Sequence, residues 1–166
     1  MLTTVTLNAA VDTTYSVENF ALDQVNRVGS KQALPGGKGI NVARIANTLG
    51  AKVQATGFVA GQNGKFIQHE LVREGIRNSF LEVAGESRVC LAIIDPVANT
   101  QTELLESGPS IPQEGFDSFA KHLLSITAEG SLVVFSGSLP GGLDSDAYAK
   151  LIEMLQEKKV ILDTSG

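Results

Sequence analysis

Cysteine, positive charge and long apolar runs are all scarce in this sequence of 166 residues. The single cysteine, Cys90, cannot form a disulfide within the chain, which suits a reducing compartment and predicts a cytoplasmic protein. The sequence has 13 Lys and Arg residues and 18 Asp and Glu residues. The resulting net charge of -5 argues against nucleic acid or an anionic membrane as a partner. No apolar run approaches the roughly 20 residues that cross a bilayer, so we expect a soluble chain.

Short β-branched runs alternate with longer amphipathic runs along most of the chain. This alternation is typical of parallel βαβ units and predicts an α/β fold with a doubly wound, mostly parallel sheet between two layers of helices. The continuous apolar runs at 132–135 and 160–162 predict strands that are covered on both faces. The expected strands are 2–7, 53–59, 131–137 and 160–163, and the expected helices are 39–49, 64–75 and 145–158.

Two stretches, 13–34 and 87–106, interrupt the alternation with the pattern of β-hairpins. In the second, Arg88, Cys90 and Ala92 share one face of the strand, because side chains alternate between the two faces. We expect these strands to form a small separate layer. Such a layer is either a lid over a binding site or an inert edge hairpin.

The chain stops a few residues after an apparently buried strand, at "VILDTSG" (160–166). A parallel strand covered on both sides needs a crossover helix after it, so we expect residues 1–166 to be the amino-terminal part of one longer domain. The alternative is that the strand at 160–163 is the edge of a complete small domain.

Residues 34–50, "LPGGKGINVARIANTLG", place three glycines and a lysine directly before a helical pattern. The stretch is no P-loop, because Gln32 occupies the position of the first glycine and Lys38 is followed by glycine rather than Ser or Thr. It also fails the dinucleotide fingerprint, because Val42 stands where the third glycine belongs. The loop can still bring backbone N–H groups and a helix N-terminus close to a ligand.

The helix after the loop repeats Val42, Ile45, Ala46 and Leu49 at helical spacing, which predicts its buried stripe. Asn41 lies in the first turn and off that stripe, where its amide could both donate to and accept from sugar hydroxyls. A tight turn followed by a solvated asparagine explains the same residues. The segment by itself leaves the two interpretations open.

Taken together, the motifs resemble the ribokinase-like sugar kinases of the phosphofructokinase-B family, in order and over the whole chain. Within that family they are most similar to the branch that holds tagatose-6-phosphate kinase and 1-phosphofructokinase. One position departs from the family pattern, because Ala60 stands where the signature has glycine. The matching stretches are "TLNAAVD" (6–12), "VNRV" (25–28), "GGKGINVA" (36–43), "GESRVCLAI" (85–93), "TELLESGP" (102–109), "SGSLPGGL" (136–143) and "LDTSG" (162–166).

The resemblance implies that Asp12, at the end of the first strand, accepts hydrogen bonds from sugar hydroxyls. Asn41 and the glycine loop at Gly36 and Gly37 would complete that grip. The pairing suits a carbohydrate, because a charged acceptor beside an amide matches neighbouring O–H groups. Outside this context the preferred interpretation of Asp12 is a turn aspartate after "NAAV".

A sugar that already carries a phosphate also needs cations, and the resemblance supplies Arg27, Lys38 and Arg88. The planar guanidinium group of arginine can donate two parallel hydrogen bonds to phosphate oxygens. We expect the three side chains to converge on the phosphoryl group. Each of them taken singly is also explained as an exposed surface charge.

"FSGSLPGG" (135–142) follows an apolar parallel strand, and ligands of such folds bind at the carboxyl ends of the strands, so Ser136 and Gly137 should border the substrate. A nucleophilic serine is disfavoured, since no G-x-S-x-G elbow is present and the helical patterns around His69 and His122 make them surface residues. Two histidines and one cysteine also predict no metal site within the chain.

The reaction implied by the resemblance is transfer of the ATP γ-phosphoryl group to a ketohexose phosphate, with Mg²⁺ balancing the charge. Tagatose 6-phosphate is the first candidate, and fructose 1-phosphate and fructose 6-phosphate are the alternatives. The family's catalytic aspartate belongs to a Gly-Ala-Gly-Asp motif that is absent here and is expected beyond Gly166, so these 166 residues should catalyse nothing. A homodimer that pairs through the lid strands is the expected assembly.

Two other functions are compatible with part of these observations. One is a non-catalytic sugar-phosphate sensor built on the same half of the fold. The other is an unrelated α/β binding domain with fortuitous motifs.

Overall fold

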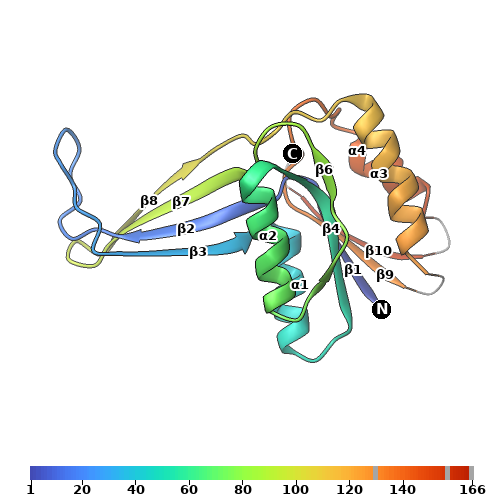
Figure 1. Cartoon of the computed structure of the whole chain (residues 1–166), viewed down its shortest axis with the longest axis horizontal. Coiled ribbons are helices and arrows are strands. Elements are labelled where there is room, and N and C mark those ends of the chain that lie inside the picture. The colour runs from blue at the N-terminus through green and yellow to red at the C-terminus, as the bar shows by residue number, and fades with distance from the viewer. Residues whose placement is uncertain (129–130, 156–157, 165–166) are drawn as a thin grey trace.

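The computed structural model describes residues 1–128, 131–155 and 158–164 of the chain. Within them the chain forms a main sheet, a second sheet and four helices (Figure 1). The main sheet contains β1 (Leu2–Thr6), β4 (Val53–Ala60), β5 (Arg77–Asn78), β6 (Leu81–Val83), β9 (Leu132–Ser136) and β10 (Lys159–Asp163). The second sheet contains β2 (Ala10–Ser16), β3 (Ser30–Gly36), β7 (Arg88–Asp95) and β8 (Thr100–Leu105). The helices are α1 (Lys38–Thr48), α2 (Gly61–Arg73), α3 (Gln113–Ile126) and α4 (Ala147–Glu153).

The main sheet is parallel at every pairing and has the order β10-β9-β1-β4-β5, with β6 beside β4. Its central strands β4 and β9 are buried on both faces, which explains the apolar run at 132–135 in β9. The doubly wound α/β fold predicted from the alternation is confirmed. The hydrophobic pattern alone did not place the short strands β5 and β6 or the bounds of α3. No helix in the described ranges is both long and apolar enough to cross a membrane.

Two apolar clusters, one on each face of the main sheet, hold the helices in place. The first joins Val5, Phe58 and Phe135 of the strands to Phe119 of α3 and Leu151 of α4. The second packs the other face of the sheet against α1 and α2, through a set that includes Ile40, Ala43, Ala55, Ile67 and Leu71. Burial of these side chains stabilises the layers by about 1.5–3 kcal/mol for each large residue.

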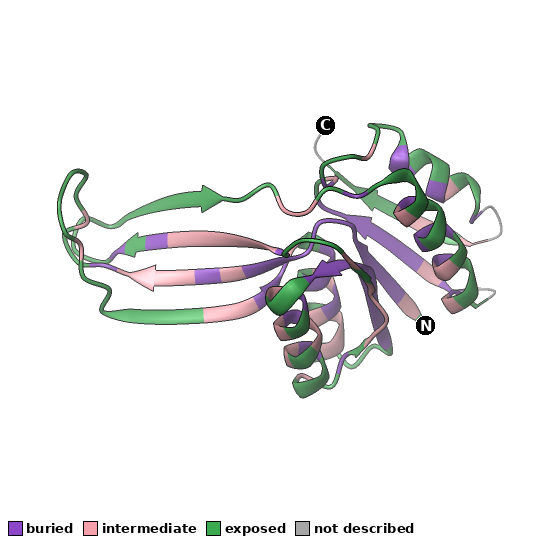
Figure 2. Ribbon diagram, turned by 45° about the horizontal axis from the view of Figure 1, so that its top comes forward, coloured by how far each residue is buried: buried purple, intermediate pink, exposed green. Residues whose placement is uncertain are grey.

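The second sheet has the order β3-β2-β7-β8 and extends from the α/β body as a long arm (Figure 1). β2–β3 and β7–β8 are antiparallel pairs, and β2–β7 is a parallel pair that joins them. The two expected hairpins therefore exist and form a separate layer, as predicted. Burial decreases along β2 and β3 as they leave the body, whereas β8 is exposed throughout and β7 has buried residues at its outer end (Figure 2).

The strand predicted from the apolar run at 160–162 is present as β10, but within the described residues it is not covered on both faces. Ile161 and Leu162 of β10 are 51% and 43% exposed. β10 is an edge strand that pairs with β9, and Val160 is its partly buried residue that packs on the first apolar cluster. Helix α4 is also shorter than the expected 145–158, and residues 156 and 157 lie outside the described part of the chain.

The buried stripe predicted for α1 is correct only in part, since Ala46 packs against the second apolar cluster. Ile45 and Leu49 are 64% and 81% exposed, and the helix buries Gly39, Ile40 and Ala43 instead. Periodicity shows that a helix has an apolar face, but α1 has two. Packing of Ile40 and Ala43 on the main sheet decides which face is buried.

Ala60, the departure from the family signature, is accommodated without strain. It precedes α2 with φ −146° and ψ 145°, an extended conformation that any residue adopts. Its N–H donates to the hydroxyl of Ser87 at 2.8 Å. The methyl group is buried and requires no glycine-specific backbone.

Asp95, at the end of β7, ties together the two turns at the tip of the arm. Its carboxylate, 2% exposed, accepts backbone N–H groups from Asn19 and Phe20 on one side and from Val97 and Ala98 on the other, at 2.9–3.1 Å. Burial raises the pKa of the Asp95 carboxyl, but the four hydrogen bonds together lower it by more. The pKa of Asp95 is therefore below its ordinary value.

We expect Asp95→Asn to lower the melting temperature by several degrees at pH 7, because an amide cannot accept the same four hydrogen bonds. A carboxyl whose pKa is lowered by folding contributes stability above its unfolded pKa, about 3.9, and loses it as the pH falls further. The difference between the two proteins should therefore shrink below about pH 4. Thermal melts at several pH values test this, with Asp117→Asn on the exposed side of α3 as the control. A difference that does not change with pH would contradict it.

Candidate functional site

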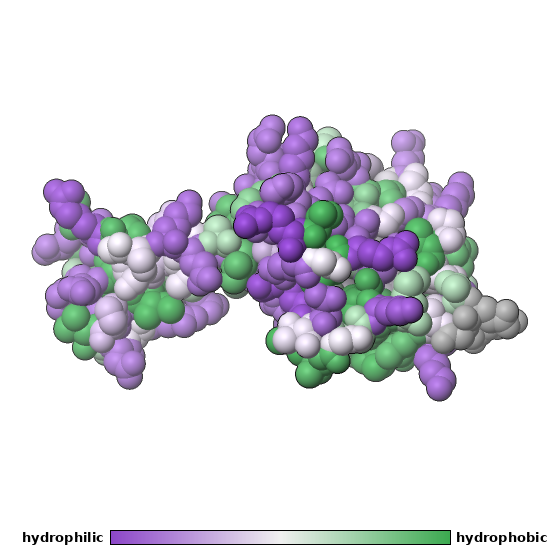
Figure 3. Space-filling view, turned by 60° about the horizontal axis from the view of Figure 1, so that its bottom comes forward, coloured by the Kyte–Doolittle hydropathy of each residue, from purple (hydrophilic) through white to green (hydrophobic). Residues whose placement is uncertain are grey.

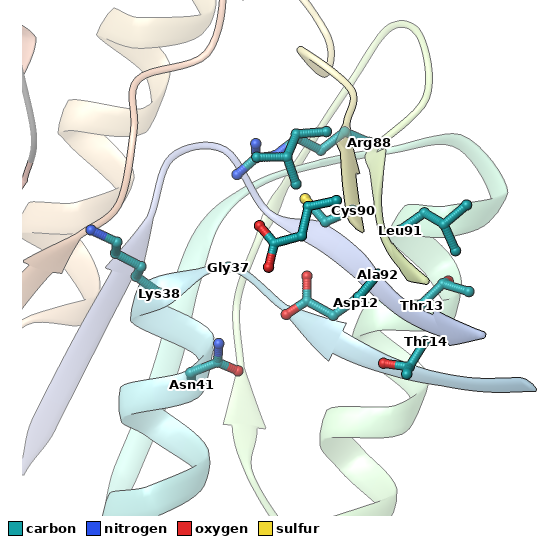
Figure 4. A pocket seen from close by; sticks show the side chains of 12 residues that line it. Asp12, Thr13, Thr14, Gly37, Lys38, Asn41, Arg88, Cys90, Leu91 and Ala92 are labelled. Atoms are coloured by element: carbon teal, nitrogen blue, oxygen red, sulfur yellow. The ribbon is translucent and has the colours of Figure 1, made fainter. Parts of the chain in front are cut away.

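A cleft of about 520 Å³ lies where the arm joins the body. The second sheet supplies most of its wall, and the start of α1 closes one end (Figure 4). The charged or amide-bearing side chains that line it are Asp12, Lys38, Asn41, Arg88 and Glu103.

Strand register explains how residues far apart in the sequence meet in this cleft. Asp12 on β2 pairs with Leu34 of β3 on one side and with Cys90 of β7 on the other, and Cys90 in turn pairs with Leu105 of β8. Residues directly opposite each other in paired strands point to the same face. The side chain of Cys90 is small, so it fills little of the space between Asp12 and β8 and leaves room for a ligand.

Asp12 is the half-buried carboxylate at the centre of the cleft. It lies within β2 and not at the end of the first strand as expected, because the chain turns at residues 7–9 after β1 and starts a new strand at Ala10. Its carboxyl group occupies the space above Gly36, where any side chain would collide with it. This close approach explains the glycine at the end of β3.

The surroundings of Asp12 make its charged form unfavourable for folding and leave the carboxylate available to a ligand. Burial raises its pKa, and hydrogen bonding to the Asn41 amide and the Gly37 backbone lowers it only in part. A carboxyl whose pKa is raised by folding binds its proton more tightly in the folded state, so its contribution to stability decreases as the pH rises through that pKa. The ionised group at neutral pH therefore costs stability, which is common for functional carboxylates.

The glycine loop directs the start of α1 at the cleft. Gly37 has φ 99° and ψ 142°, a conformation that side chains disfavour, and it precedes Lys38 at the first turn of the helix. No side chain caps this end of α1, and the first intrahelical hydrogen bond runs from the N–H of Asn41 to the carbonyl of Gly37. The free N–H groups and the helix dipole favour negative charge here.

Arg88, at the start of β7, lies across the cleft from α1 (Figure 4). Its Nε donates to the carbonyl of Asn8 at 3.2 Å, which fixes the stem of the side chain. The Asn8 amide in turn donates to the carbonyl of Ser107 at 3.1 Å and so joins the start of the arm to the segment after β8.

Ser136 and Gly137 lie at the carboxyl end of a buried parallel strand, as the sequence predicts. Ser136 ends β9, and its hydroxyl donates to the Asp163 carboxylate at 2.9 Å. It lines a hollow beside the cleft, and the two spaces share Lys38 and Asn41. Gly137 lies next to the backbone of Lys38. The predicted Ser136–Gly137 edge therefore adjoins the Asp12 cleft.

Arg27 does not reach this cleft within the chain. It lines a separate hollow at the tip of the arm, together with Glu18, Asn19 and Asn26. Of the three cations expected to converge, Lys38 and Arg88 line the cleft and Arg27 does not. The long extension of the arm is the reason, since Arg27 follows β2 beyond its outer end.

Glu103 is a cleft residue that the sequence did not single out. It lies on β8 opposite Ala92, which in turn pairs with Thr14 of β2. The alternating pattern had already placed Arg88, Cys90 and Ala92 on one face. The sequence does not reveal the register between β7 and β8. In the structure this register pairs Ala92 with Glu103 and so places Glu103 on the same face.

His122 is not the surface residue that its helical pattern suggested. It is partly buried on α3, where its Nε2 lies 2.9 Å from the carbonyl oxygen of Ser79 and 3.1 Å from the Ser79 hydroxyl. These contacts join α3 to the segment between β5 and β6. His69 is exposed on α2, as expected.

The arrangement can grip a polar molecule that carries one anionic group. Asp12 and Asn41 offer a charged acceptor and an amide, and Lys38, Arg88 and the N-terminus of α1 offer positive potential. Within residues 1–128, 131–155 and 158–164, no three His, Cys, Asp or Glu side chains gather as metal ligands. The cleft therefore has the composition of a binding site for a hydroxylated anion.

The sequence and the fold of the chain match one family of known proteins. Residues 5–166 match the pfkB family carbohydrate kinase model. The chain is 40% identical to tagatose-6-phosphate kinase of Staphylococcus epidermidis, over 100% of this chain and 54% of the relative. The fold matches Escherichia coli phosphofructokinase-2 in complex with fructose-6-phosphate (TM-score 0.92, 26% identity, 100% of this chain and 55% of that one).

A protein of Thermotoga maritima named as a possible 1-phosphofructokinase also matches (TM-score 0.86, 32% identity, 99% of this chain and 54% of that one). The chain thus spans about half the length of these relatives. The family match covers nearly every residue, and the folds agree along the chain. The chain therefore belongs to the pfkB family of carbohydrate kinases.

Proposed function

We propose that the chain binds the sugar-phosphate acceptor of an ATP-dependent kinase, in the cleft between the arm and α1. The observation that carries the proposal is the convergence of Asp12, Asn41, Lys38 and Arg88 on one cleft from three different elements. Asp12 and Asn41 would hold the sugar hydroxyls. Lys38 and Arg88 would neutralise the phosphoryl group that the sugar already carries.

Tagatose 6-phosphate is the proposed substrate, and tagatose 1,6-bisphosphate is the product of its phosphorylation. The 40% identity to a tagatose-6-phosphate kinase supports this choice. Fructose 6-phosphate and fructose 1-phosphate are the alternatives, since a phosphofructokinase complexed with fructose-6-phosphate has the same fold. The three sugars offer the same chemistry to the cleft, namely one phosphoryl group and a row of hydroxyls.

ATP is the proposed phosphoryl donor and Mg²⁺ the proposed cofactor, as in other carbohydrate kinases of this family. We assign neither of them to a residue of this chain, since the described residues offer no metal-ligand group. The sequence also contains no Gly-Ala-Gly-Asp motif for the catalytic base. The chain should therefore position the acceptor, and the 166 residues by themselves should transfer no phosphate.

A homodimer through the arm is the proposed assembly. Leu22 and Val25 in the loop beyond β2 are 85% and 87% exposed, and Leu104 on β8 is 54% exposed. Figure 3 shows apolar patches on the arm among polar ones, beyond a narrow waist that separates it from the body. A second copy would cover this apolar surface, and the arm strands would serve as both a lid and an interface.

Lys38→Ala and Asn41→Ala should each raise the Kd for tagatose 6-phosphate about tenfold or more, which is about 1.4 kcal/mol of binding free energy. Each variant removes one polar contact at the end of the cleft. Isothermal titration of the chain with tagatose 6-phosphate, fructose 6-phosphate and fructose 1-phosphate measures the effect. Lys65→Ala, on the exposed side of α2, is the control. Binding that is unchanged in both cleft variants would contradict the site.

The binding of sugar phosphate should weaken as the pH falls through the pKa of Asp12, which lies above the usual value of about 3.9. Protonation removes the charged acceptor that the sugar hydroxyls need. The phosphate of the ligand also titrates, with a second pKa near 6. The ratio of the wild-type Kd to the Asp12→Asn Kd cancels that effect, because both proteins meet the same ligand. A ratio that stays constant between pH 8 and pH 4 would rule out the role of Asp12.

Leu22→Asp combined with Val25→Asp should convert a dimer into a monomer, because charges cannot be buried in an apolar interface without a large cost. Sedimentation equilibrium measures the mass, and circular dichroism checks that the fold is kept. Leu124→Asp, a partly exposed residue of α3 outside the arm, is the control. A chain that is monomeric before any substitution contradicts the proposed assembly.

Phosphoryl-transfer assays on the complete protein encoded by the gene separate a kinase from a non-catalytic sensor. ADP release with one of the three sugars would support the kinase. Binding of the sugar without ADP release would favour the sensor.

A further inference from the structure

The charges that line the cleft balance each other. Lys38 and Arg88 contribute two positive charges, and Asp12 and Glu103 contribute two negative ones. A site built only to attract phosphate would have an excess of cations. The carboxylate of Glu103 therefore needs a role of its own.

Glu103 is an exposed residue of β8 at the wall of the cleft. One of its oxygens accepts a hydrogen bond from the amide of Gln101 at 2.6 Å, which leaves the other oxygen available to a ligand. Its partner across the strands is Ala92, whose small side chain does not screen the carboxylate from the cleft. By contrast, Glu106 is engaged elsewhere, with an oxygen that accepts the N–H of Val89 at 2.8 Å.

Cys90 lies on β7, between Asp12 of β2 and the strand β8 that carries Glu103. Burial is the main reason that the pKa of its thiol is raised, while Arg88 lowers it. The charges of Asp12, Glu106 and Glu103 all add to the increase. A ligand in the cleft therefore meets negative charge from β2 and from β8.

We propose that Glu103 makes the cleft selective for sugars with one phosphoryl group over sugars with two. This inference rests on the proposed function of the same cleft. A monophosphate carries up to about two negative charges at pH 7, and a bisphosphate carries about twice as many. In a cleft with no net positive charge, Lys38 and Arg88 compensate one phosphoryl group, and the second one meets the repulsion of Glu103.

This selectivity has a direct consequence for the proposed reaction. Phosphorylation of a ketohexose phosphate yields a bisphosphate, so the ligand that Glu103 disfavours is the product. Tight binding of product would slow turnover, because its release would become limiting. A carboxylate in the acceptor cleft therefore favours the release of product after transfer.

The test measures the Kd of the chain for fructose 6-phosphate and for fructose 1,6-bisphosphate by isothermal titration. We expect Glu103→Gln, which keeps the shape and removes the charge, to lower the ratio of the bisphosphate Kd to the monophosphate Kd about tenfold. The change should shrink at 0.5 M salt, since screening weakens charge repulsion. Glu82→Gln, on β6 outside the cleft, removes the same charge elsewhere and should leave the ratio unchanged.

A ratio that stays the same in Glu103→Gln, or that changes equally in Glu82→Gln, would overturn the inference while leaving the cleft a sugar-phosphate site. A wild-type chain that binds neither sugar would instead overturn the proposed function. Because both ligands are measured on each folded variant, a general loss of stability lowers both affinities and does not imitate a change in their ratio.

Discussion

The pairing of β2 with β3 on one side and with β7 on the other is the constraint on which the cleft depends. It places Asp12 between a strand that leads into the glycine loop and a strand that begins with Arg88. A shift of the register by one residue would turn Asp12 to the opposite face of the sheet. Gly36 completes the arrangement, because only a residue without a side chain leaves space for the carboxylate.

The cleft contains groups that are costly for folding and useful for binding. The ionised carboxylate of Asp12 is half buried, and its pKa is raised. The start of α1 has no side-chain cap, although such a cap commonly stabilises a helix by about 1 kcal/mol. Both features leave polar groups ready for a partner that the chain itself does not provide. A hydroxylated anion would satisfy the carboxylate and the free N–H groups together.

The position of the cleft joins the two sheets into one functional unit. Lys38 and Asn41 line both the cleft beneath the arm and the hollow beside Ser136, at the carboxyl end of β9. This is the edge of a parallel sheet where α/β proteins bind their ligands. The arm brings Arg88 and Glu103 to the cleft that adjoins this edge. The second sheet thus supplies charge, and the main sheet supplies the rigid support.

The sequence by itself determined the α/β class, the two hairpins and the glycine loop, because alternation, apolar runs and turn residues are local signals. It also indicated Asp12, Lys38, Asn41 and Arg88 through motifs. Only the tertiary structure decided that α1 buries Ile40 instead of Ile45, that Arg27 lies outside the cleft and that Glu103 lies inside it. These outcomes depend on helix packing, on the length of the arm and on strand register, which arise from contacts between residues far apart in the chain.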